Sequence, residues 1–196
     1  MTEPALRTRK QQIIATAADL FREKGYKATS MRDIAAKVGM EAASMYSHIK
    51  SKEDLLVDIC MECAQWFTRG MEDISSSQQS EDCKLKDLIS LHVSIAFDHP
   101  ASVTVFNDEW RHLPEPHLGD FIKARKSYES AFRNMLEAGR LTGTFSFVHT
   151  EIVFNIIMKC MSWSYLALGK YSKEEITAEI TTFIVNALKH TEDTVS

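Results

Sequence analysis

The residues between positions 42 and 48 could read the edges of DNA bases. Most of them carry small or polar side chains, which leave one face of a short helix free of bulky groups. A helix with such a face fits the major groove of B-DNA, which is about 12 Å wide. Hydroxyl groups can bond to base edges there, and a lysine at a helix N-terminus suits a phosphate. The residues with these properties are Ala42, Ala43, Ser44, Ser47, His48 and Lys52.

Two short helices behind a longer one must position these side chains. Apolar residues at helical spacing predict a helix over residues 11–24 that ends at a glycine. Ser30 and an acid three residues later indicate a capping box that opens a helix over residues 31–38. A second short helix, over residues 42–48, follows Gly39. This arrangement is typical of a helix-turn-helix DNA reader, and the alternative is a helical hairpin with no role in DNA binding.

The charge distribution favours contact with a polyanion at one end of the chain. The formal net charge is −4, but residues 1–50 hold nine Lys/Arg against five Asp/Glu, a net of +4, and the remaining residues carry −8. A basic end on an acidic body is expected of a chain that docks to nucleic acid through that end. Arg7, Arg9 and Lys10 provide a basic segment before the first helix. Chance drift in composition is the alternative explanation.

Between Phe21 and Leu56 the chain resembles the N-terminal domain of TetR-family repressors. The residues that carry the resemblance are Phe21, Gly25, Tyr26, Thr29, Ser30, Met31, Asp33, Ile34, Ala35, Val38, Gly39, Met45, Tyr46, His48, Ile49, Ser51, Lys52, Glu53, Leu55 and Leu56. The resemblance implies an all-helical homodimer that binds a palindromic operator and carries a larger ligand-binding, dimerising domain. It implies DNA-backbone contacts at Thr29, Tyr46, His48 and Lys52, base contacts at Ala42, Ala43, Ser44 and Ser47, and a place for Ser30 in the DNA-binding set.

Glu41 departs from this family pattern. The family usually has Ser or Thr as the cap of the recognition helix, and this chain has a glutamate there. Glutamate is a poorer N-cap than Ser or Thr, and its negative charge repels phosphate. We therefore expect the local docking geometry to differ from the family pattern at this position.

The rest of the chain also predicts helices. Only seven glycines and four prolines occur in 196 residues, which disfavours sheet folds with frequent turns. Helical spacing and start signals give about nine helices in total and an all-α fold. We predict a DNA-binding domain over residues 1–51 and a ligand-binding and dimerisation domain over 52–196, connected by a helix from about 52 to 74. Further helices are predicted at 85–97, 101–112, 119–138, 149–168 and from Ser172 to about Leu188.

The second domain contains a candidate ligand site. Fifteen of the eighteen aromatic residues lie beyond residue 50, and apolar pockets are rich in such side chains. The region from about 99 to 190 is similar to a TetR branch whose members often respond to acyl-CoA thioesters, through Arg125, Tyr128, Glu129, Arg133, Leu136, Gly139, Gly143, Phe145, the Trp163–Tyr165 segment and Tyr171–Ile176. The residues that could line a tunnel for an acyl chain are Phe97, Phe106, Trp110, Phe121, Tyr128, Phe154, Met158 and Met161. The residues that could hold the phosphates of coenzyme A are Arg111, Lys123, Arg125 and Lys126. The alternative is an ordinary aromatic core with solvated charges.

Several other functions are excluded or disfavoured by the sequence. No G-x-S-x-G, P-loop or G-x-G-x-x-G pattern occurs, so we predict no enzyme, no cofactor and no metal site. Cys60 and Cys63 share one helical face, which favours packing over redox chemistry. Neither a signal peptide nor a membrane span is indicated, and we expect a cytoplasmic protein.

We therefore predict a ligand-responsive repressor. It would bind its operator as a homodimer formed through the last two helices, and a small apolar or acyl-CoA-type effector would release it. The alternative is a dimeric helical small-molecule-binding or adaptor module without specific DNA recognition.

Overall fold

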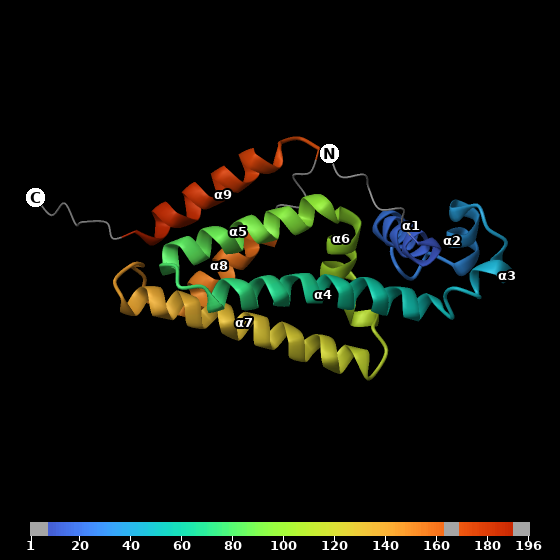
Figure 1. Ribbon diagram of the computed structural model, residues 1–196, viewed down its shortest axis with the longest axis horizontal. Helices are drawn as coiled ribbons and strands as arrows, with labels where there is room; N and C mark the ends of the chain where they lie inside the picture. The colour runs from blue at the N-terminus through green and yellow to red at the C-terminus, as the bar shows by residue number, and fades with distance from the viewer. Residues whose placement is uncertain (1–7, 163–168, 190–196) are drawn as a thin grey trace, which may run out of the picture. The chain divides into compact units, whose positions relative to one another are not determined.

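The computed structural model describes residues 8–162 and 169–189, and within these ranges the chain is all-helical (Figure 1). Nine α-helices and one short 3₁₀ helix form there, without a β-strand. This confirms the all-α prediction. In chain order they are α1 (Arg9–Lys24), α2 (Met31–Val38), α3 (Ala42–Met45), α4 (Lys52–Ser76), α5 (Glu81–Asp98), α6 (Pro100–Asp108), η1 (Trp110–His112), α7 (His117–Leu141), α8 (Thr150–Ser162) and α9 (Lys173–Leu188).

The chain divides into two compact units. The first combines Met1–Ala64 with Ala101–Ile122, and the second combines Gln65–Pro100 with Lys123–Ser196. Helices α4 and α7 therefore each contribute residues to both units. The boundary between a DNA-binding domain that ends at residue 51 and a ligand-binding domain that begins at residue 52 stays a prediction.

The first unit is organised around one apolar cluster. Ile13, Phe21, Ile34 and Leu55 are fully buried in it, and α6, η1 and the start of α7 add further residues. The helix starts follow the capping signals in the sequence, because the Ser30 hydroxyl accepts a hydrogen bond from the Asp33 N–H and the Asp33 carboxylate accepts one from the Ser30 N–H. This confirms the predicted capping box.

The second unit is built on α5, which packs against α8 and α9. Figure 1 shows α9 alongside α5. Gly70 of α4 also allows a close helix approach, since a Cβ there would lie 2.4 Å from Cδ2 of Leu91. The fully or nearly fully buried residues of this unit include Leu85, Leu88, Ile89, Val93, Phe132, Leu136 and Phe154.

Several predicted elements differ from the structure, and α5 and α7 begin earlier than predicted, at Glu81 and His117. The helix predicted over residues 42–48 ends as an α-helix at Met45 and continues as a tighter turn, because the N–H groups of Ser47 and His48 bond three residues back. The helix predicted over 101–112 is divided into α6 and η1, and α4 extends into the predicted 75–80 loop as far as Ser76. The end of the helix predicted over 149–168 lies outside the described residues. None of the described helices is long and apolar enough to span a membrane.

Candidate functional site

The segment around α3 presents a polar face to solvent. Ala43, Ser44, Ser47 and His48 are exposed, and the Tyr46 side chain is 53% exposed. Met45 and Ile49, by contrast, are buried in the core of the first unit. Ala42 is partly buried. The segment is thus held by two apolar anchors and leaves small and polar groups free on the outside.

The N-terminus of α3 carries the weak cap expected from the sequence. Glu41 occupies the N-cap position, and its side chain makes no capping hydrogen bond. The Ser47 hydroxyl instead donates to the Ser44 carbonyl at 2.7 Å, which supports the turn at the other end. Glu41 is itself exposed, so its charge lies at the end of the segment that would approach DNA.

Ser30 lies at the exposed N-terminus of α2. Its hydroxyl is 2.5 Å from Oδ2 of Asp33, to which it donates. Hydrogen bonds from the Ser30 side chain and backbone hold the pKa of Asp33 below its ordinary value. The capping role of Ser30 therefore places a carboxylate beside the positive end of the helix dipole.

Lys52 points into the first unit. Its ammonium donates hydrogen bonds of 3.0 Å to the carbonyl oxygens of both Tyr26 and Thr29. It also lies 4.3 Å from the centre of the Tyr26 ring, within the range of a cation–π interaction. An ammonium has three donors, so one N–H remains beyond these two bonds. Sequence reasoning missed the internal contacts of this lysine.

Thr29 lies inside the same turn. Only 2% of the residue is exposed, and its hydroxyl lies 2.9 Å from the Gly25 carbonyl and 3.3 Å from the Leu20 carbonyl. The side chain therefore supports the connection between α1 and α2 instead of reaching solvent. The Thr29 hydroxyl is therefore not exposed for the predicted contact with the DNA backbone.

Glu109 fixes the other side of this turn. Its Oε1 accepts a 2.9 Å hydrogen bond from the Tyr26 N–H, and its Oε2 lies 3.1 Å from Nδ1 of His112. The rings of Tyr26 and His112 are 5.5 Å apart. Burial, together with the charges of Glu53 and Glu109, raises the pKa of Tyr26 to about 12. Because 83 positions separate Glu109 from Tyr26, no local signal in the sequence could have found this contact.

The predicted ligand residues fall into two groups. Phe106, Trp110, Arg111 and Phe121 belong to the first unit, where the Trp110 and Phe121 rings stack at 5.5 Å. Phe106 is 5.2 Å from Phe121, and the Arg111 guanidinium lies 4.5 Å from the Trp110 ring. The group in the second unit contains Phe97, Arg125, Tyr128, Phe154, Met158 and Met161.

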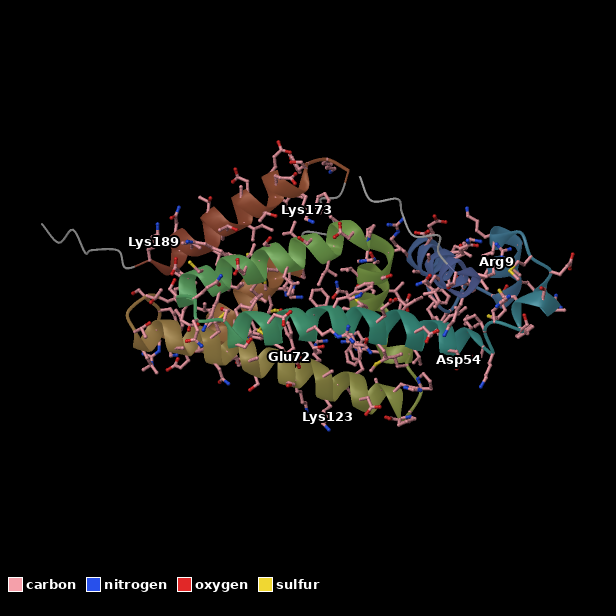
Figure 2. All side chains as sticks on the ribbon, in the orientation of Figure 1. Arg9, Asp54, Glu72, Lys123, Lys173 and Lys189 are labelled. Carbon is pink, nitrogen blue, oxygen red and sulfur yellow. The ribbon has the colours of Figure 1, made fainter. Side chains whose placement is uncertain are left out.

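Several charged residues of the second unit form ion pairs. Arg125 binds Glu129 at 3.0 Å, and Arg133 binds both Glu129 and Glu151. The Arg133 guanidinium also lies 3.8 Å from the Phe154 ring. Figure 2 shows Lys123 on the outer side of α7, and both Lys123 and Lys126 are exposed. Both lysines are among the exposed cations of the described residues and are accessible to a phosphate group.

The interior of the second unit contains a polar pair that sequence reasoning missed. His92 on α5 hydrogen-bonds through Nε2 to the Tyr128 hydroxyl on α7. Phe67 on α4 packs against both rings. Tyr128 was a predicted ligand residue, whereas the sequence analysis did not single out His92.

Cys60 and Cys63 are fully buried. Burial raises the pKa of both thiols, that of Cys60 to about 12. Both thiols are therefore protonated at neutral pH and poor nucleophiles, as the packing interpretation expects.

Helices α8 and α9 expose large apolar side chains. Ile152 and Ile156, one turn apart on α8, are 57% and 54% exposed, and Phe183 on α9 is 64% exposed. Scattered apolar groups are normal on protein surfaces, but two isoleucines at i and i+4 form one stripe on a helix. This stripe is available for burial against another surface.

Comparison with known families and relatives gives consistent matches. Residues 13–59 match the family model described as bacterial regulatory proteins of the tetR family, and residues 78–188 match the tetracyclin repressor-like C-terminal domain. The HTH-type transcriptional repressor KstR2 of Mycolicibacterium smegmatis is 28% identical over 145 residues, which span 74% of this chain and 70% of that protein.

Solved structures show the same fold. The ketosteroid transcriptional regulator KstR2 of Mycobacterium tuberculosis has a TM-score of 0.89 at 21% identity, covering 95% of this chain and 97% of that one. AibR, solved in complex with isovaleryl coenzyme A and operator DNA, has a TM-score of 0.78 at 21% identity, covering 90% of this chain and 97% of that one.

Proposed function

The chain belongs to the TetR family of bacterial regulatory proteins, and from this we propose that it is a transcriptional repressor released by a small-molecule effector. It binds a palindromic operator as a homodimer. The observation that carries this proposal is the polar face at residues 43–48, held outward by the buried Met45 and Ile49. We assign it a regulatory and not a catalytic role.

The DNA contacts divide by exposure. Ala43, Ser44 and Ser47 face base edges, with Ala42 at the margin because it is partly buried. Tyr46, His48 and the exposed Ser30 meet the DNA backbone, and Lys52 offers it the one N–H that Tyr26 and Thr29 leave free. Thr29 acts by positioning the turn, since its hydroxyl is buried. Phosphate contacts set orientation, and base contacts set sequence preference.

Dimerisation through the last two helices uses the exposed apolar stripe. A two-fold interface brings the same surface of each copy together, so Ile152, Ile156 and Phe183 would be buried on both sides. Two readers joined in this way reach half-sites about 34–36 Å apart, one helical turn of DNA. This explains how a reader as short as α3 gains affinity.

The effector we propose is an acyl-CoA thioester. The aromatic residues of the second unit can hold an acyl chain, while exposed cations such as Lys123 and Lys126 suit its phosphates. AibR, which shares the fold, was solved with isovaleryl coenzyme A and operator DNA. Release requires only that the effector binds two states of the dimer with different affinity, typically by about 1–3 kcal/mol.

Operator binding is the decisive test. An operator is first selected from a pool of random duplexes, and its affinity is then measured by fluorescence anisotropy from 50 to 300 mM salt beside a scrambled duplex. We expect a steep salt dependence on both duplexes and clear preference for the selected one. Equal affinity for both would favour the alternative, a helical ligand-binding or adaptor module without specific DNA recognition.

Effector release is tested separately. Acyl-CoAs of graded chain length are screened by thermal shift, because a ligand stabilises the folded protein according to its concentration over Kd. The best binder should then lower operator affinity about 5–150-fold. Operator affinity that stays constant at saturating effector would refute release while leaving DNA binding intact.

A further inference from the structure

Three side chains from three helices meet inside the second unit. They are Phe67 of α4, His92 of α5 and Tyr128 of α7. The His92 ring lies 4.7 Å from the Phe67 ring and 5.9 Å from the Tyr128 ring, and its Nε2 shares a hydrogen bond with the Tyr128 hydroxyl. Side chains of α4, α5 and α7 fill the space between these helices (Figure 2). The pair is therefore a polar site with an aromatic wall.

The pair always has one hydrogen-bond donor to spare. If Nε2 accepts the Tyr128 proton, the neutral imidazole carries its own proton on Nδ1 and can donate it elsewhere. If Nε2 donates to the Tyr128 oxygen, the phenolic O–H is left over. Within the described part of the chain, the His92 side chain makes no hydrogen bond besides this one. Either tautomer therefore leaves a donor for a further oxygen.

Both groups are neutral at physiological pH. Burial lowers the pKa of His92 to about 4 and raises that of Tyr128 well above its ordinary value. Among the described residues, no charged side chain contributes to either pKa shift. A site without a cation does not compensate the desolvation of a carboxylate, so the pair selects a neutral acceptor over an ionised one.

The His92 side chain is surrounded by other side chains but keeps some solvent-accessible surface. Tyr128 is 8% exposed, whereas His92 is partly exposed. Burial nevertheless lowers the pKa of His92. His92 Nδ1 is not among the fully buried side-chain atoms without a partner. The accessible part of an otherwise enclosed imidazole is where a small molecule can reach it.

We propose that His92 and Tyr128 together form the polar anchor of the effector site, donating a hydrogen bond to a neutral carbonyl oxygen on an otherwise apolar ligand. Phe67 forms the apolar wall beside that oxygen. The proposal rests on the proposed function in one respect, that the second unit binds the effector. A thioester carbonyl meets the requirement, and so does a ketone.

Two coenzyme A derivatives that differ only at the carbonyl test the anchor. Decanoyl-CoA carries the thioester oxygen, and S-decyl-CoA is the thioether without it. Isothermal titration of the full chain should show decanoyl-CoA binding about fivefold to tenfold more tightly, the contribution of one hydrogen bond. The variant that removes the donating group, Tyr128→Phe if the phenol donates and His92→Phe if the imidazole donates, should reduce this preference to near unity.

Matched controls separate anchoring from folding. Tyr171→Phe makes the same chemical change at an exposed tyrosine and should retain the wild-type preference. Far-UV circular dichroism establishes that each variant is folded, and the ratio of two ligands cancels any general loss of binding. Equal affinity of the wild type for the two derivatives, or a preference that survives in both Phe variants, overturns the proposal.

A second probe keeps this result independent of coenzyme A and of DNA. If neither derivative binds, thermal shift with 2-undecanone is measured on the wild type, on Tyr128→Phe and on His92→Phe. A shift that is lost in either variant supports the anchor and rejects the coenzyme A effector, whereas no shift in the wild type, or a shift that survives in both variants, overturns the anchor. Failure of operator binding is read from the anisotropy experiment alone, so the two proposals fail separately.

Discussion

Lys52→Met removes the ammonium that ties the α1–α2 turn to the start of α4 while keeping most of the aliphatic stem. The ammonium makes two hydrogen bonds of 3.0 Å and one cation–π contact. Hydrogen bonds to a charged group contribute about 1.5–3 kcal/mol each and an exposed cation–π contact about 0.5–1 kcal/mol. Because Lys52 is only partly buried, solvent screening reduces the total below the simple sum of these contributions, and we expect about 2–3 kcal/mol.

This loss should be visible in thermal melts and in DNA binding. For a chain of this size about 1 kcal/mol shifts Tm by about 2–4 °C, so Lys52→Met should lower Tm by about 4–12 °C. If the third N–H meets a phosphate, the slope of log affinity against log salt becomes less negative by about 0.9 per subunit. Affinity should fall by the same factor on the selected operator and on the scrambled duplex.

Lys50→Met is the control, since Lys50 is an exposed lysine two residues away. It should leave Tm unchanged within about 2 °C, as surface substitutions usually cost under 0.5 kcal/mol. An unchanged Tm in Lys52→Met would refute the internal role of the ammonium. An unchanged salt slope would refute the phosphate contact, and an altered sequence preference would show that Lys52 faces a base.

The other predictions concern separate parts of the molecule. Glu109→Ala leaves the Tyr26 N–H without its acceptor and should lower the free energy of unfolding in urea by about 1–3 kcal/mol, with Glu109→Gln restoring part of it through its amide oxygen. Ser47→Ala should change base preference in operator selection without changing the salt slope. His92 takes up a proton below about pH 6.5 in the unfolded chain, but only below about pH 4 in the folded protein. The contribution of His92 to stability therefore falls as the pH drops through this window. His92→Gln should make Tm less dependent on pH there. Ile156→Glu should convert a dimer to monomer in light scattering, because a charge would replace an apolar side chain in the buried stripe.

Elements governed by local chemistry were predictable from the sequence. α2 begins and ends at the predicted residues, because the Ser30 cap and the left-handed backbone of Gly39, with φ of 72°, depend only on near neighbours. The exposed face around α3 also agrees with the sequence pattern. Its early end at Met45 was not predictable from periodicity, since the following turn keeps apolar Ile49 buried without continuing the α-helix.

Contacts between distant segments were not predictable. The sequence marked Thr29 and Lys52 as polar groups near a DNA reader, but their inward direction depends on carbonyl oxygens exposed by the turn at residues 25–29. The sequence did not single out His92 of α5, because the Tyr128 hydroxyl that it contacts comes from the distant α7. Helical periodicity reports which residues share a face, and it carries no information about which helix will cover that face.

The apolar cluster of the first unit has a consequence for protein engineering. Ala101, Val105, Leu113 and Phe121 complete this cluster from a segment that follows α5 in the chain. A chimera that transplants only the first 64 residues onto another regulator would expose the apolar surface these four side chains cover, and it would also lose the Glu109 acceptor. The DNA reader is therefore not a detachable module, and a functional graft must carry residues 101–122 with it.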